Sequence, residues 1–162
     1  MKKTEDNFFS KGFTELLINS VGGYVTPERF EYFLRKMQGE LSKYHFTPAT
    51  ESNLIRLVSS LFDKVSFLNE AVKYPHHLEI VAAIVSNSNF LTDIIVQNPG
   101  LLYQVFDNDY LRREENNESL CGEIYRSITP FKSFNSKLNY LRRFKKRYIV
   151  KTGLNNRLGF RD

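Results

Sequence analysis

The chain has 162 residues, of which 41% are hydrophobic and 25% charged, a composition that excludes a disordered chain and allows a buried core. Its one cysteine, Cys121, excludes an internal disulfide and a thiolate metal cluster. No apolar run follows the charged N-terminus, so we expect no signal peptide and a cytoplasmic protein. The longest apolar run, residues 80–85, is far shorter than the ~20 residues that span a bilayer, so we expect no membrane segment.

The positive charge is concentrated at the C-terminal end. The whole chain has a formal net charge of +5, yet residues 131–162 hold ten Lys/Arg and one acid, and residues 1–130 hold thirteen Lys/Arg and seventeen acids. This asymmetry predicts two parts: a mildly acidic helical body over residues 1–130 and a strongly basic segment over residues 131–162.

Apolar residues recur at helical spacing along the chain, and no stretch shows the alternation typical of a β-strand. We therefore predict an all-α fold, an irregular bundle of about eight helices that ends in a long basic helix. Thr26-Pro27 is a typical helix start, with Thr as the N-cap and Pro at the first helical position. The expected helices cover about residues 4–19, 27–44, 50–65, 67–73, 76–86, 88–97, 99–106, 120–128 and 133–155.

Turn-forming residues set the expected boundaries between these helices. Thr47-Pro48 is expected to end the second helix, so that Thr50 or Ser52 opens the third. Ser66 is expected to cap the fourth helix. Residues 107–119 are the most polar stretch and form either an exposed turn of helix or a mobile loop.

Two segments resemble parts of one known family. In the first, Asn53-Leu54-Ile55-Arg56-Leu57 and Pro75-His76-His77-Leu78-Glu79-Ile80 precede residues 88–102, which read as a Ser-x-Phe-Leu-x-Asp helix and a Pro-x-Leu-Leu helix start. The second is the basic run of residues 141–151, followed by Leu158-Gly159. In order and spacing both are similar to the glutamine synthetase adenylyltransferase/deadenylylase family, in which the basic helix precedes a nucleotidyltransferase core. The resemblance covers roughly residues 50–160.

The resemblance implies a non-catalytic role for this chain. It would be the N-terminal helical part of such an enzyme, supporting the nucleotidyltransferase domain in the regulation of nitrogen assimilation. The implied partners are therefore that domain and glutamine synthetase. Family members use two nucleotidyltransferase domains, one to add AMP to glutamine synthetase and one to remove it by phosphorolysis.

The family's catalytic signature is Gly-Ser followed by Asp-x-Asp, whose carboxylates hold Mg²⁺ against the nucleotide phosphates. The full-length enzyme is thus expected to need Mg²⁺ and ATP. Because this signature follows the basic helix in the family, we expect it beyond Asp162, with no cofactor and no catalysis in residues 1–162 alone. The chain departs from the family pattern at Tyr148, where Glu is usual, and at Asn155-Asn156, where Arg-Asp is usual.

Other residues with chemical potential have simpler interpretations. Asp107-Asn108-Asp109 is the one Asp-x-Asp, but no Gly-Ser precedes it, which favours a solvated helix C-terminus or turn. His76-His77 point to different faces of a helix and make a poor metal-chelating pair, and His45 stands alone. Gly22-Gly23 lacks the rest of a phosphate loop and indicates a plain turn. Cys121 has no histidine near it in sequence and is expected to be a buried, inert thiol.

The basic helix is the main candidate for binding. Its cations are expected to cover the polar face, opposite an apolar face that includes Leu138, Leu141 and Phe144. A solvated amphipathic helix and an acidic partner surface are both consistent with this pattern, whereas nucleic acid is less favoured because no groove-reading motif is present. The predicted partner-binding residues are Arg142, Arg143, Lys145, Lys146, Arg147 and Lys151.

Two alternatives stay open at this point. The chain could be a stand-alone helical binding module for protein or nucleic acid that uses the basic helix. It could also form a homodimer, because a C-terminal helix without the domain it packs on would leave Phe144, Tyr148 and Ile149 partly exposed.

Overall fold

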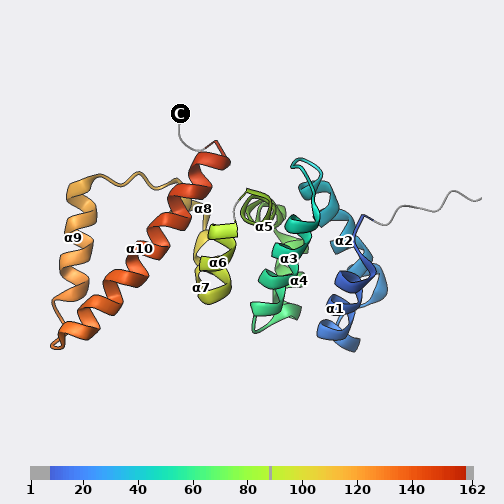
Figure 1. Cartoon of the computed structure of the whole chain (residues 1–162), viewed down its shortest axis with the longest axis horizontal. Coiled ribbons are helices and arrows are strands. Elements are labelled where there is room, and N and C mark those ends of the chain that lie inside the picture. Colours follow the sequence, from blue (N-terminus) through green and yellow to red (C-terminus); the bar gives the residue numbers. More distant parts are fainter. Residues whose placement is uncertain (1–7, 88, 160–162) are drawn as a thin grey trace, which may run out of the picture. The chain divides into compact units, whose positions relative to one another are not determined.

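The computed structural model describes residues 8–87 and 89–159, and every regular element within them is a helix, which confirms the all-α prediction. The chain divides into two compact units, Met1–Pro99 and Gly100–Asp162, here called unit 1 and unit 2 (Figure 1). The sequence had placed the boundary after residue 130. It lies earlier because the helices after residue 100 pack on the long basic helix.

Unit 1 is organised around one apolar helix, α5. This helix contacts α2, α3, α4 and α6, and it buries eight side chains, seven of them apolar. The other helices turn an apolar stripe towards the interior; α1, for example, buries Phe13, Leu17 and Val21. The elements are α1 (Lys11–Val21), η1 (Gly22–Tyr24), α2 (Pro27–Leu41), α3 (Pro48–Ser60), α4 (Lys64–Lys73), α5 (Pro75–Asn87) and α6 (Asn89–Gln97).

The helix starts in unit 1 confirm one prediction and correct two. Thr26 caps α2, as expected. Thr47-Pro48 does not end the second helix, because α2 already ends at Leu41; it begins α3 instead, where Thr47 and Thr50 form a reciprocal capping box. In α4 the cap is Asp63, whose carboxylate accepts the backbone N–H of Ser66, the residue that the sequence suggested as cap.

Helix α1 begins at Lys11, so the expected start near residue 4 is wrong for residues 8–10, and residues 4–7 lie outside the described part. Phe8 and Phe9 precede the helix and contact the ring of Phe46 instead. The Gly22-Gly23 pair forms a short 3₁₀ turn after α1, in keeping with the predicted turn.

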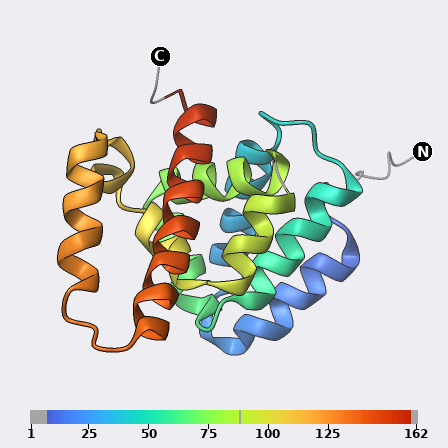
Figure 2. The same ribbon diagram turned by 60° about the vertical axis from the view of Figure 1, so that its left-hand side comes forward.

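The described part of unit 2, residues 100–159, has four helices, and the last of them, α10, contacts the other three (Figure 2). They are α7 (Gly100–Val105), α8 (Asn108–Arg112), α9 (Asn117–Ile128) and α10 (Phe134–Arg157). Within residues 107–119, α8 is a short helix, as one of the two alternatives predicted, and residues 113–116 are not helical. Asn116 and Ser119 make a capping box that starts α9 earlier than predicted. Ser133 caps α10, at the start expected from the sequence.

No single helix in the described part of the chain is long and apolar enough to cross a membrane. Helices α5 and α6 reach the required length and apolarity only when taken together, and they are bent by 120° where they join.

Candidate docking surface on the basic C-terminal helix

Lys151 anchors the C-terminal half of α10 to the rest of unit 2. Its side chain is 1% exposed, and its Nζ donates to the Oε1 of Glu115 and to the carbonyl oxygen of Arg113, both at 2.8 Å. The ammonium also lies 4.9 Å from the centre of the Tyr110 ring. A buried cation is stable only when it is paired and hydrogen-bonded, and here both conditions are met by the loop after α8.

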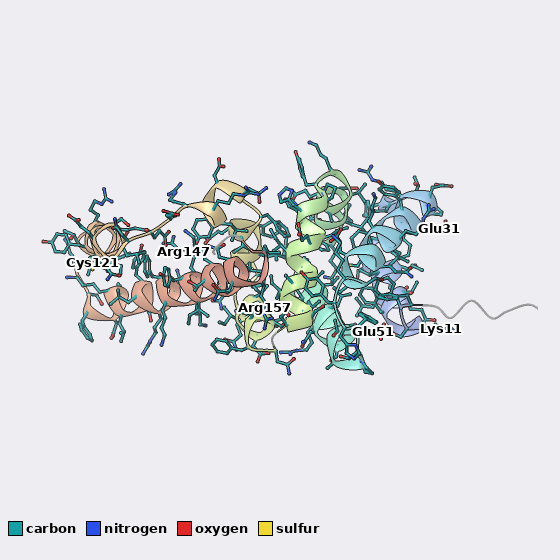
Figure 3. The ribbon with its side chains drawn as sticks, turned by 90° about the horizontal axis from the view of Figure 1, so that it is seen from above. Lys11, Glu31, Glu51, Cys121, Arg147 and Arg157 are labelled. Atoms are coloured by element: carbon teal, nitrogen blue, oxygen red, sulfur yellow. The ribbon has the colours of Figure 1, made fainter. Side chains whose placement is uncertain are left out.

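Arg147 lies one turn before Lys151 and joins α10 to α9 (Figure 3). Its guanidinium donates to the carboxylate of Glu123 and lies 5.0 Å from the Phe144 ring centre. Burial is the largest single influence and disfavours the charged guanidinium, but the hydrogen bond to Glu123, the Glu123 charge and the two nearby tyrosines Tyr110 and Tyr140 together leave the pKa of Arg147 raised. Burial also raises the pKa of the neighbouring Tyr110 to about 12, although the charge of Arg147 opposes this shift.

Asn155 and a row of aromatic rings complete the inward side of α10. The buried Asn155 amide donates to the carbonyl oxygen of Leu111 at 2.9 Å, so it holds the end of α8. Nearer the start of α10, Tyr140 lies between Phe131 and Phe144, with ring centres 6.1 and 6.3 Å apart. The rings and the anchoring polar groups thus fix the rotation of α10 about its own axis.

These contacts correct the predicted arrangement of the basic helix. The sequence placed all six cations on the polar face, but Lys151 and Arg147 point inward, because Glu115 and Glu123 neutralise them there. Leu141 was expected on the covered face and is 37% exposed. The predicted partner-binding role of the other four cations stays a prediction: Arg142, Arg143 and Lys145 are exposed, and Lys146 is half-buried.

The remaining sequence candidates occupy structural positions. Asp107 caps α8, where its carboxylate accepts the backbone N–H groups of Asp109 and Tyr110. Both cap hydrogen bonds go to Oδ1 of Asp107, which gives this carboxylate a structural role. Among the described residues, no group of three His, Cys, Asp or Glu side chains is placed to hold a metal ion.

Cys121 and His77 were interpreted from the sequence as a buried thiol and as part of a poor metal-chelating pair. Cys121 lies exposed on α9, so the expectation of a buried thiol is wrong; α9 buries none of its side chains (Figure 3). His77 is buried at the start of α5, and burial, together with the charge of His76, lowers its pKa to about 4. Its ring lies 4.4 Å from that of His76 in an edge-on contact, which favours a packing role.

A polar cluster between α3 and α6 is a feature that sequence reasoning missed. The Asn53 amide is buried and donates to the carbonyl oxygen of Val85 and to the side chain of Asn89. Arg56, one turn along α3, donates to the side chains of Asn53 and Asp93. The signal that could have identified it is the position of these residues, since they fall in the two stretches 53–57 and 88–102 that carry the family resemblance.

Unit 1 also has an open apolar groove of about 420 Å³ between α1 and α2. Glu31 and Thr14 supply its polar groups. Periodicity alone could not reveal it, because the same apolar spacing describes a covered helix face. The other lining residues are Ile18, Val21, Val25, Pro27, Phe30 and Leu34.

Comparison of this chain with models of known protein families, with curated proteins and with solved structures finds no match.

Proposed function

We propose that this chain is the N-terminal, non-catalytic helical part of a glutamine synthetase adenylyltransferase/deadenylylase. In this proposal it supports the nucleotidyltransferase domain and helps to set the AMP load of glutamine synthetase, and so nitrogen assimilation. The observation that carries the proposal is the ordered resemblance of residues 50–160 to that family, from the Ser-x-Phe-Leu-x-Asp helix to the basic helix and its Leu-Gly end.

The positions of the resembling residues give physical support. Arg56 and Asp93, from the two parts of the first segment, form an ion pair between α3 and α6. In the second segment Gly159 has a φ of 68°, a left-handed conformation that favours glycine and ends a helix. The motif positions therefore have structural roles in both units, as a packing resemblance requires.

The proposed role in the reaction is mechanical. Lys151 and Asn155 fix α10 against α8, so the helix is held as a rigid element at the end of unit 2. The bond-making chemistry would belong to the Gly-Ser and Asp-x-Asp residues of the nucleotidyltransferase domains, with Mg²⁺ supplied there. We accordingly assign no proton transfer or phosphate contact to the described residues.

A genetic experiment tests this proposal. The coding region for residues 1–162 is deleted in frame in the native organism, and the AMP load of glutamine synthetase is measured by mass spectrometry after a shift in nitrogen supply. We expect the shift in AMP load to be slowed or lost. An unchanged response would contradict the proposal.

Two variants test whether this function depends on the anchor of α10. Phe62→Ala changes a fully exposed ring and should leave the AMP response intact, whereas Lys151→Ala releases the anchor of α10 and should reproduce the deletion. In a matched assay, the purified chain with adenylylated glutamine synthetase and phosphate should form no ADP, and turnover would refute the non-catalytic role.

A stand-alone binding module is the second candidate. The observation that favours it is the exposure of Arg142, Arg143 and Lys145 on a helix that has no acidic residue. In that case deletion would leave the AMP load unchanged, while the exposed cations would still bind a partner.

A further inference from the structure

Helix α10 has a second, outward stripe besides the one that anchors it. Phe134, Leu138, Leu141 and Lys145 follow the spacing i, i+4, i+7, i+11 and so share one face. The anchoring stripe of Tyr140, Phe144, Arg147 and Lys151 has the same spacing six positions later. At roughly 100° per residue the two faces are turned from each other by about 120°.

Large apolar side chains on the outward stripe are open to solvent. Phe134 is 76% exposed and Leu141 37%, and Leu138 between them is half-buried. Tyr125 near the end of α9 is also 71% exposed. Single exposed apolar residues are ordinary, but a row at helical spacing is the pattern by which a helix enters an apolar groove.

The charge beside this stripe has no compensation along the helix. Arg142 and Lys145 are exposed, and no acid lies three or four positions from either. The residues three and four positions after Arg142 are Lys145 and Lys146, which are also cations. Like charges at this spacing destabilise a helix. Residues 124–159 contain ten Lys/Arg and no acid, so the chain around the stripe supplies positive charge only.

We propose that the outward stripe of α10 is a docking surface for an acidic protein surface, specifically an apolar groove bordered by carboxylates. The groove takes Phe134, Leu138 and Leu141, and the carboxylates pair with Arg142 and Lys145. The inference rests on the proposed function, which makes glutamine synthetase the partner to which the stripe would bind.

Charge complementarity selects the occupant. Carboxylates at the border of the groove would offset the like-charge repulsion along α10, and the apolar groove would cover Phe134, Leu138 and Leu141. A single protein surface can therefore pair with the cations and bury the apolar side chains. A nucleic acid would satisfy the cations through its phosphates but would leave the aliphatic part of the stripe unused.

The test measures binding of the full chain to immobilised glutamine synthetase from the same organism, at low and at physiological salt. The double variant Arg142→Glu/Lys145→Glu should weaken binding by about tenfold or more, because each reversal replaces attraction with repulsion. Leu141→Ser should weaken it by about tenfold without changing its salt dependence. All three side chains are exposed, so the variants should keep the helical circular dichroism of the parent.

The matched control is Arg29→Glu/Lys36→Glu, which makes the same change in net charge at exposed positions of α2. It should alter affinity by less than about twofold if the effect is local. Equal losses in both double variants would overturn the inference, because binding would then follow net charge alone.

Two further outcomes distinguish the inference from the proposed function. If the parent chain binds glutamine synthetase and neither α10 variant changes the affinity, the docking role stands and the assignment of this stripe is overturned. If the parent binds a short DNA duplex and not glutamine synthetase, or binds neither, both the protein partner and the stripe assignment fail.

Discussion

Unit 1 and unit 2 keep their central helices in place by different kinds of contact. Helix α5 in unit 1 buries seven apolar side chains and His77, so hydrophobic burial on all sides fixes it. Helix α10 in unit 2 is almost twice as long yet buries four side chains, and two of them, Lys151 and Asn155, are polar. Helix α9, which has 12 residues, buries none of its side chains.

The difference has a consequence for specificity. Apolar packing tolerates many side-chain combinations of similar volume, whereas a buried ammonium must meet its carboxylate and carbonyl partners to be stable at all. Unit 2 therefore gains a defined rotation of α10 from a few polar groups. That rotation decides which cations and which apolar side chains face solvent.

The largest effect expected from a single change is in the apolar core of unit 1. Phe33 is fully buried on α2, and its ring meets that of Phe67 edge-on, with centres 6.1 Å apart. Phe33→Ala should lower the free energy of unfolding by about 4 kcal/mol, because it removes buried apolar area and leaves a cavity. Denaturant unfolding measures this change. Phe62→Ala, at a fully exposed ring, should cost less than about 0.5 kcal/mol.

Removing the polar anchor of unit 2 should have the next largest effect. Lys151→Ala leaves the Glu115 carboxylate and the Arg113 carbonyl without their donor, at an expected cost of about 3 kcal/mol. Amide hydrogen exchange should show the loss first in α8 and in the loop before α9. Lys145→Ala, on the exposed side of α10, should leave exchange unchanged; equal loosening by both variants would show that the ion pair is not the anchor.

The fold was largely predictable, because helical periodicity and caps are local properties of sequence. The main error in unit 1 concerned Thr47-Pro48, which was interpreted as the end of a helix, although α2 ends at Leu41 and Pro48 takes the favoured first position of α3. The start of α1 was placed too early because Phe8 and Phe9 continue an apolar pattern, although they pack on Phe46 and not within a helix.

The candidate docking surface was predictable in composition but not in orientation. The partners of Arg147 and Lys151 lie 24 and 36 residues away, at Glu123 and Glu115, beyond the range of any helical pattern. Local spacing therefore grouped the two inward cations with the outward ones and hid Leu141 among the covered residues. The proposed family role adds no orientation either, because a resemblance in packing positions does not say which side chains meet.

The smallest predicted effect is a pH dependence of the stability of unit 1, which is caused by His77 in α5. Its pKa is about 4 in the folded chain and near 6.5 when unfolded, so between these values the unfolded chain binds the extra proton. The free energy of unfolding is therefore highest above about pH 6.5 and falls as the pH drops towards 4. The expected decrease is about 2 kcal/mol once partial solvation of the ring is allowed for. Denaturant midpoints at several pH values test this, and His77→Leu should flatten the dependence in this window. His76→Gln is the control, because it keeps the buried ring of His77. If His77→Leu keeps the pH dependence of the parent, another group causes the loss of stability. If hydrogen exchange shows the loss of stability first in unit 2, the assignment to unit 1 is wrong.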